Sequence, residues 1–534
     1  MGRTRMPRTP DSATPDWASP DVASPDSVSD VVVVGGGHNA LISAAYLAEA
    51  GLSVTVLEGR DVVGGNTVTE ELTLPGWQHD SCSSAHVVLQ SNPLIRADEL
   101  GLVSRYGLEY LVTDPAVVLP LDGGDVLTIH PDLAATAAEF ARFSLADADA
   151  LTAMMSDWSA GLRTAHAHYS AGVPLPDDVW AARYEELRGR SAWDVIMSTF
   201  EHPVVRHAMT WMAFATIQPP ERPGTGALPA AIMAGRISFG WTTPVGGSGA
   251  LPDALVAHIT DHGGVVESSA WVESFVVEDG RCVGARTTDG RLFRGTRAVV
   301  AGSHLATLRH MLDTESPMAA EAAARWRPGI SVFAVHFALK GDIRYRTTSG
   351  PMSAVAGGLG SPEGLHRQVA SAYAGQLETE EPWLLMVSST VVDPARAPGG
   401  VFKFLTVAPE LLDGQPWTED DAAVYTDALL AYARQHVDGL DPDDILAIRP
   451  ESPATIAAHN LANIGGSCHG GEFVLDDGSV IPGWPEYRCD VPGLYLTGST
   501  SHPGGSVSGR PGRNTARIVL ADLGLDPADV MTLP

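Results

Sequence analysis

The glycine pattern Gly35-x-Gly37-x-x-Ala40 constrains the fold of this chain more than any other feature. It follows a run of valines at 31–34, typical of a strand buried on both faces, and precedes an alanine-rich stretch that predicts a helix. In such a βαβ unit Gly35 permits a tight turn, Gly37 lets the backbone approach a pyrophosphate, and Ala40 allows close helix packing. Glu58 ends the next predicted strand. The pattern therefore predicts a dinucleotide-binding fold in which Glu58 accepts hydrogen bonds from ribose hydroxyls.

Two further glycine-rich segments favour FAD over NAD as the dinucleotide. Gly64 and Gly65 follow the second strand and let the backbone pass close to the phosphates. Near the carboxyl end, an apolar run at 494–497 leads into PGGSVSG at 503–509, a loop with few bulky side chains. A helix predicted from Gly512 directs its free N–H groups toward this loop, as expected beside a phosphate or a flat ring. No second fingerprint of comparable quality occurs in the sequence, so a reductase that binds both FAD and NAD(P)H is not expected.

Three segments carry a resemblance to a known family: DVVVVGGGHNALISAAYLAEAGLSVTVLEGRDVVGGNTVTEE, TPVGGSGALPDALVAHITDHGGVV and GLYLTGSTSHPGGSVSGRPGRNTAR. From Asp30 to about Leu523 the chain resembles the phytoene-desaturase-like branch of the FAD-dependent amine oxidase superfamily. This branch includes carotenoid desaturases and a carotenoid-ketolase-like group, which the segment GLEYLVTDPAVVLPLDGG also resembles. The resemblance implies a flavoprotein oxidoreductase with bound FAD.

The resemblance also implies which residues bind FAD. It places Asn39 with the first glycines on the pyrophosphate, Arg60 with Glu58 around the adenosine ribose, and Val272 beside the adenine. The loop after Gly498 is expected near the flavin. Ala40 stands where the family pattern has a third glycine. The complete predicted set is Gly35, Gly37, His38, Asn39, Ala40, Glu58, Arg60, Gly64, Gly65, Asn66, Val272, Gly498, Gly505, Ser506 and Val507.

The predicted elements indicate an α/β fold with two domains interleaved along the sequence. A Rossmann-type, glutathione-reductase-like FAD-binding domain alternates with a substrate domain of mixed sheet and helices. The FAD-binding domain is predicted at 30–125, 241–315 and 476–534, and the substrate domain at 126–240, which is mostly helical, and 316–475. Residues 1–29 repeat a Pro-Asp unit with little apolar surface, so they are expected to be a disordered leader.

Composition narrows the partners. The 34 Lys and Arg against 64 Asp and Glu give a formal net charge of −30, which disfavours nucleic acid and leaves at most peripheral contact with anionic membranes. No apolar stretch of about 18 residues and no secretion signal appears, so we expect a cytoplasmic chain. The four cysteines have no metal-ligand or dithiol spacing, so they are expected to be reduced thiols, and no metal site is predicted. An oligomer is compatible with the sequence.

Candidate catalytic groups are few, because hydride transfer to a flavin needs no protein acid or base. If a proton must also leave the substrate, His502 in the flavin loop is the first candidate; the alternative is that it orients that loop. His469 is a second candidate. His166 and His168 point apart on a helix, which excludes a metal pair there. Ser248 lacks the surroundings of a hydrolase nucleophile. An aromatic and methionine cluster is interpreted as core rather than cavity wall; its members are Met209, Trp211, Met212 and Phe214.

Three functions remain open at this point. The first is an FAD-dependent desaturase, dehydrogenase or oxidase acting on a fairly apolar small molecule such as a polyene or terpenoid. The second is oxidation of an amine or a secondary-metabolite intermediate, because one fold supports several chemistries. The third is a flavin-fold binding protein or chaperone with little turnover.

Overall fold

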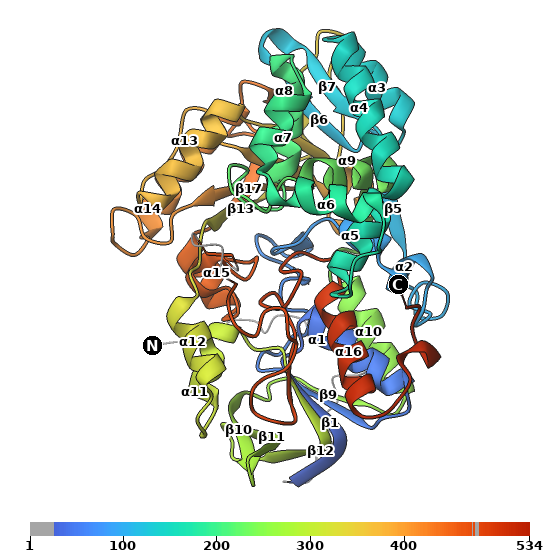
Figure 1. Ribbon diagram of the computed structural model, residues 1–534. Helices are drawn as coiled ribbons and strands as arrows, with labels where there is room; N and C mark the ends of the chain where they lie inside the picture. Colours follow the sequence, from blue (N-terminus) through green and yellow to red (C-terminus); the bar gives the residue numbers. More distant parts are fainter. Residues whose placement is uncertain (1–25, 473, 476–479, 534) are drawn as a thin grey trace, which may run out of the picture.

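Two seven-stranded sheets organise the chain in the computed structural model, which describes residues 26–472, 474–475 and 480–533. In Figure 1 the first sheet lies at the bottom, and the second lies in the upper half with the helices of residues 133–239. Each sheet combines strands from distant parts of the sequence, so the two domains interleave along the chain. The fold is α/β, with a Rossmann-type first domain.

The first sheet is built around the valine-rich strand β1. The sheet order is β10-β11-β12-β1-β2-β9, and β20 pairs with the end of β12. Residues 31–34 pair in parallel with β12 on one side and β2 on the other, and none is more than 5% exposed. β-Branched side chains suit a pleated surface that is covered on both faces. The strands are β1 (Asp26–Val34), β2 (Val54–Leu57), β9 (Val265–Glu267), β10 (Val272–Glu278), β11 (Arg281–Thr287), β12 (Leu292–Ala301) and β20 (Leu494–Leu496).

Helices cover both faces of this sheet. On one face α1 (His38–Glu49), α10 (Ala250–Asp261) and α16 (Arg510–Asp522) share an apolar cluster with β1 and β2. The other face is covered by α11 (Leu305–Met311) and α12 (Pro317–Arg325). The crossing of α1 and α16 requires a glycine, because a Cβ on Gly512 would overlap the carbonyl oxygen of Asn39. The amino ends of α1 and α16 therefore lie side by side.

The second sheet has the order β19-β13-β17-β16-β15-β6-β7. Its long strand β13 is buried throughout and pairs antiparallel with β17 and β19. Helix α14 packs on one face, and α13 joins the apolar cluster on the other. The elements of this domain are β6 (Val117–Pro120), β7 (Val126–Ile129), β13 (Ser331–Leu339), β15 (Ala356–Leu359), α13 (Pro362–Tyr373), β16 (Leu384–Ser388), β17 (Gly400–Ala408), α14 (Glu419–Ala433), β19 (Ile445–Glu451) and α15 (Pro453–His459).

A layer of helices completes the second domain, and its apolar side chains pack against the second sheet in one cluster. These helices are α3 (Leu133–Ala141), α4 (Leu145–Asp157), α5 (Arg163–Ser170), α6 (Val179–Gly189), α7 (Ala192–Thr199), α8 (Pro203–Phe214) and α9 (Leu228–Phe239). The short elements are β3 (Thr69–Glu70), β4 (His79–Asp80), α2 (Pro93–Arg96), β5 (Tyr110–Thr113), β8 (Trp241–Pro244), β14 (Arg344–Tyr345) and β18 (Val437–Asp438). Among the described helices, none combines the length and apolar character needed to cross a bilayer.

Three predicted boundaries differ from the structure. Strand β1 begins at Asp26, so residues 26–29 of the expected leader pair with β12; residues 1–25 lie outside the described part. Strand β6 at 117–120 belongs to the second sheet, although the FAD-binding segment was expected to run to 125. Helix α12 packs on the first sheet, beyond the predicted boundary at 315. These three differences have one cause. The domain to which a short apolar segment belongs depends on the strand it pairs with or the sheet it packs on, and its local sequence does not specify that partner.

Candidate functional site

Three glycines lie at the carboxyl ends of adjacent parallel strands of the first sheet. Gly35 follows β1, Gly302 follows β12 and Gly498 is two residues beyond β20. The Gly302 amide donates to the Val34 carbonyl at 2.7 Å, and the Thr497 amide donates to the Ala301 carbonyl at 2.9 Å. These hydrogen bonds keep the strand ends in register. Because each end is a glycine, no side chain projects from the sheet edge at these positions. A crevice for a ligand at this edge is the general property of open parallel sheets.

The amino end of α1 opens onto this edge. Gly37 is its N-cap, without a side-chain hydrogen bond, and the first turn contains no acidic residue. A Cβ placed on Gly37 would meet no atom within 4 Å, and its φ of −66° is ordinary for any residue. The fold itself therefore does not require a glycine at this position. Free N–H groups and empty space beside them fit a pyrophosphate, which explains the glycine.

The carboxylate of Glu58 is fixed beside this helix end. Its Oε2 accepts from the Gly36 amide at 2.6 Å, and its Oε1 accepts from the Arg60 amide at 2.8 Å. The backbone of 269–270 lies against the same turn, because the Ala270 amide donates to the Glu58 carbonyl at 2.7 Å. Val272 begins β10 two residues later. The structure thus brings Glu58 and Val272 to one side of the loop, which fits recognition of adenosine.

Trp271 also lies beside the turn at Glu58, and it is not among the site residues predicted from the sequence. A Cβ on Gly59 would overlap the indole, so Trp271 packs directly on the turn after Glu58 although 44% of its surface is exposed. The available signal was an aromatic residue at the start of the strand that also carries Val272.

The second glycine pair packs on the fingerprint loop. The Gly64 amide donates to the Gly36 carbonyl at 2.8 Å, and a Cβ on Gly65 would lie 3.1 Å from the Cα of Gly37. The next residue, Asn66, reaches the second domain: its Oδ1 accepts from Asn460 Nδ2 at 2.8 Å, and its Nδ2 donates to Asn463 Oδ1 at 2.9 Å. Gly64, Gly65 and Asn66 therefore join the fingerprint loop to the second domain.

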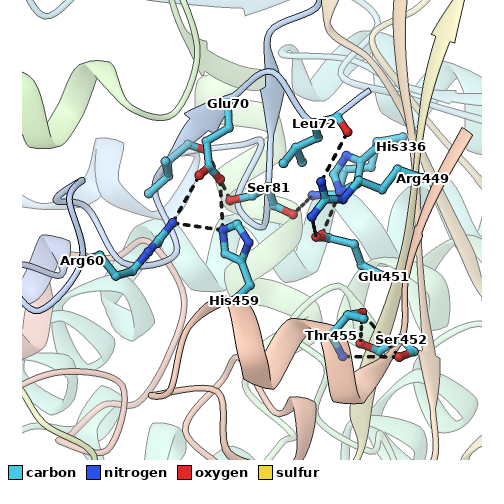
Figure 2. A network of polar contacts seen from close by, with 12 residues as sticks. Arg60, Glu70, Leu72, Ser81, His336, Arg449, Glu451, Ser452, Thr455 and His459 are labelled. Atoms are coloured by element: carbon cyan, nitrogen blue, oxygen red, sulfur yellow. Dashed lines mark hydrogen bonds and ion pairs between the residues drawn. The ribbon is translucent and has the colours of Figure 1, made fainter. Parts of the chain in front are cut away.

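Arg60 serves the same junction. Figure 2 shows Arg60 and His459, the last residue of α15, both reaching Glu70. Arg60 Nη2 lies 3.2 Å from Glu70 Oε1, and His459 Nε2 lies 3.0 Å from Glu70 Oε2. The hydrogen bond to Glu70 raises the pKa of His459. Only the backbone of Arg60 lies at Glu58, whereas its guanidinium pairs with Glu70 and contacts His459 of the second domain at 3.2 Å.

The carboxyl-terminal loop returns to the start of α1. The ring of His38 is hydrogen-bonded to the Ser506 backbone, and burial lowers the pKa of His38 to about 4. Asn39 Oδ1 accepts from the Gly512 amide at 3.3 Å, so the side chain of Asn39 ties α1 to α16. The Gly505 amide donates to the His469 carbonyl at 3.2 Å. Ser506 has a φ of 113°, and Val507 beside it is buried.

His502 is anchored rather than free in this loop. Its Nε2 lies 2.6 Å from the Tyr169 carbonyl oxygen, and Tyr169 and Trp484 contact its ring edge-on at centroid distances of 4.8 and 5.0 Å. The side chain is 6% exposed, and burial lowers its pKa. A neutral ring whose Nε2 donates to a carbonyl is suited to orienting the loop.

The remaining candidate histidines contact neighbouring groups, and the predicted aromatic and methionine cluster lies in the core. His469 Nδ1 contacts Cys468 Sγ at 3.3 Å, and burial lowers the pKa of His469 to about 4. His166 contacts the Tyr184 hydroxyl, whereas His168 bonds to the Pro174 carbonyl, so the two point apart. All four cysteines are free. The predicted core cluster is at most 2% exposed, and its members are Met209, Trp211, Met212 and Phe214.

A buried charged group at the domain junction was not predicted from the sequence. Asp80 pairs with Arg396 at 2.8 Å, with both side chains 1% exposed. Lys403 on β17 donates to the carbonyls of 80, 81 and 82, at 2.5 Å for Cys82. The chain contains only two lysines. Because Lys403 stands within an apolar strand pattern, the sequence could have indicated that this charged side chain is buried.

Comparisons with known proteins identify the family of this chain. Residues 41–408 match the family described as flavin containing amine oxidoreductase. The mouse protein named pyridine nucleotide-disulfide oxidoreductase domain-containing protein 2 is 26% identical, over 92% of this chain and 94% of that protein. A limonene dehydrogenase subunit of Castellaniella defragrans is 25% identical, over 93% and 95%. A lycopene-forming phytoene desaturase of Pseudescherichia vulneris is 25% identical, over 92% and 99%.

The fold is also shared with a solved structure. Cyclohexylamine oxidase from Brevibacterium oxydans superposes with a TM-score of 0.54 at 17% identity, over 93% of this chain and 99% of that one. The family match covers well over half of the chain, and the glycine cradle, the open end of α1 and Glu58 fit FAD. The chain therefore belongs to the flavin containing amine oxidoreductase family, and it is an FAD-dependent oxidoreductase of the phytoene-desaturase-like branch.

Proposed function

We propose that the chain removes hydride from a fairly apolar small molecule, of polyene or terpenoid type, and transfers it to FAD. The observation that carries this proposal is similarity along more than nine-tenths of the chain to a limonene dehydrogenase subunit and a phytoene desaturase. FAD, when bound, would supply the hydride acceptor, so the chain's own residues would bind and orient the substrate, and any proton released in forming a double bond would pass to a basic side chain or to water. Desaturation, dehydrogenation and oxidation all begin with this step.

Apolar side chains near the loop that contains Gly505 support this substrate class. Ile330 and Ile456 belong to the large apolar cluster of the second domain, and Cys468 packs against it. His469 follows Cys468 and binds the Gly505 amide through its carbonyl. The apolar cluster therefore extends to the loop that we assign to the flavin, where a hydrocarbon would be favoured over a charged substrate.

Oxidation of an amine is the second candidate, favoured by the fold shared with cyclohexylamine oxidase. An ammonium group needs a carboxylate or an aromatic face to replace its hydration. Two buried carboxylates of the second domain and its junction already have partners: Asp80 pairs with Arg396, and Glu451 with His336. Buried Lys403 adds positive charge. These contacts weigh against an amine.

The test is anaerobic reduction of the purified flavoprotein. The holoprotein is mixed in turn with phytoene in detergent, with limonene and with cyclohexylamine, and loss of the flavin absorption band is followed. The proposal expects bleaching with phytoene or limonene. Bleaching with the amine alone would contradict it, and no bleaching with any compound of a wider screen would support a binding or chaperone role instead.

We propose that His502 is a positioning residue. It would hold the flavin loop through the Tyr169 carbonyl. His502→Ala removes this hydrogen bond, so we expect normal flavin content and a fall in kcat of about tenfold, roughly one hydrogen bond. The pH profile of kcat distinguishes the alternatives. It keeps its shape if His502 positions the loop and loses one limb if His502 transfers a proton.

A further inference from the structure

Three potential metal ligands meet at the end of α1 that lies away from the nucleotide loop. Glu49 is the last residue of α1, His258 lies on α10, and His262 follows one turn later, directly after the end of α10. Their ligand atoms all lie within 4.8 Å of one another. We propose that these three side chains bind one divalent transition-metal ion of the zinc class.

The spacing of the ligand atoms fits a tetrahedral ion. His258 Nε2 lies 3.3 Å from Glu49 Oε2, and His262 Nε2 lies 3.1 Å from the same oxygen. Zinc bonds of about 2.0–2.1 Å in a tetrahedron place neighbouring ligand atoms about 3.3 Å apart. Two imidazoles one helical turn apart with one carboxylate form a ligand set that suits Zn²⁺, Cu²⁺ and Ni²⁺ better than Mg²⁺ or Ca²⁺.

The hydrogen bonds leave the correct nitrogen free. His262 Nδ1 donates to the His258 carbonyl at 2.8 Å, so the lone pair of a neutral His262 ring lies on Nε2, which faces Glu49. Such an outer hydrogen bond fixes the tautomer in known metal sites. Both ring nitrogens of His258 are buried without a geometrically suitable hydrogen bond among the described residues, and Nε2 is the one that lies near Glu49. Burial of this kind is costly, and a metal ion would satisfy that nitrogen.

The surroundings also favour a cation. Helix α1 ends at Glu49 and α10 ends next to His262, so both negative dipole ends lie beside the site. Burial lowers the pKa of His258, which keeps its ring neutral and able to act as a ligand. Tyr106 packs edge-on against His258 at 5.3 Å, and its hydroxyl donates to Asp261 at 2.8 Å, which holds the ring in place.

The site is open enough for an ion and one water. The side chains of Glu49 and His262 are 31% and 23% exposed, whereas His258 is completely buried. Three protein ligands would leave a fourth tetrahedral position for water. Helix α1 starts at the phosphate loop, and its 12 residues place Glu49 about 17 Å away at 1.5 Å per residue. The ion would therefore clamp α1 to α10 and take no part in hydride transfer.

The test uses untagged holoprotein treated with a chelator and dialysed. Zinc titration by calorimetry should give about one site per chain, and the melting temperature should rise with zinc concentration. His262→Ala and, separately, Glu49→Gln should weaken zinc binding at least tenfold while flavin content stays unchanged. His310→Ala is the matched control, because His310 is an exposed histidine in the last turn of another helix, and it should bind zinc normally.

Two outcomes would overturn the proposal. One is wild-type protein that binds no zinc, which would leave only polar contacts between Glu49 and the two histidines. The other is His262→Ala and Glu49→Gln protein that binds zinc as well as wild type. If either variant fails to fold, X-ray absorption of the zinc-loaded wild type decides: a shell with two imidazoles supports the site, and any other shell contradicts it.

Discussion

The nucleotide edge of the first sheet and the charged junction of the second domain hold their polar groups in opposite ways. At the edge, the amino end of α1 has no side-chain cap, and the space beside Gly37 is empty of protein atoms. At the junction, Asp80 is bonded to Arg396, to Thr69 and to the Ser248 amide. We expect a ligand to complete the edge, whereas the buried charge of Asp80 at the junction already has its partners within the protein. Substitutions at the edge should therefore change binding, and substitutions at the junction should change stability.

The largest expected effect is loss of the buried ion pair. Asp80→Asn leaves the Arg396 guanidinium without its charge partner in a place where both side chains are 1% exposed. Breaking a buried pair from one side typically costs about 3–5 kcal/mol. We expect the free energy of unfolding to fall by that amount, measured by urea denaturation of the holoprotein.

An exposed pair of the same length provides the control. Arg346 Nε lies 2.7 Å from Asp438, with side chains 49% and 55% exposed. Solvent screens such a pair, so Asp438→Asn should cost about 1 kcal/mol or less. Equal losses in the two variants would show that burial does not distinguish the junction from the surface.

The second prediction separates binding from stability at the edge. Gly37→Ala adds a methyl group into space that only the ligand would fill, so FAD affinity should fall at least tenfold, which is about 1.4 kcal/mol, while the apoprotein melts normally. Gly64→Ala is the contrasting variant. Its φ of 119° and a Cβ only 2.7 Å from the Thr67 carbonyl oxygen should lower the melting temperature of the apoprotein. Flavin titration and thermal melting of both apoproteins give the two measurements, and a Gly37→Ala apoprotein that melts early would contradict the assignment.

The same contrast explains what the sequence could predict. Recognition at the edge uses backbone geometry within one local unit, so the glycines, Glu58 and the returning loop are predictable from the amino-acid sequence. The side-chain contacts of Arg60 are not, because they depend on a separate two-stranded sheet that carries Glu70 and on His459, which is 399 positions away. The partners Asp80 and Arg396 are 316 positions apart, and no local pattern announces such a pair. The Glu49 cluster joins two helices more than 200 residues apart, although the spacing of His258 and His262 is visible in the sequence.

The last prediction concerns pH and a histidine at the junction. His86 is completely buried, its Nε2 lies 2.7 Å from Ser248 Oγ, and burial lowers its pKa to about 3, partly opposed by Asp80. An unfolded histidine titrates near 6.5, so below that pH the unfolded chain binds a proton that the folded chain does not. His86 therefore makes stability fall as pH falls, by about 1.4 kcal/mol per pH unit and about 2 kcal/mol by pH 5.

His86→Gln keeps a polar group near Ser248 but cannot titrate. The free energy of unfolding of both proteins is measured at pH 7 and pH 5 from urea denaturation. The decrease in the variant should be about 2 kcal/mol smaller than the decrease in the wild type. Above about pH 7.5 the two curves should run parallel, because His86 is then neutral in both folded and unfolded wild-type chains. His310→Gln, at an exposed position, should follow the wild-type curve. Parallel curves for His86→Gln and wild type down to pH 5 would mean that His86 binds a proton in the folded protein. The contrast between a junction whose charges are paired within the protein and an edge that requires a ligand would then hold only near neutral pH.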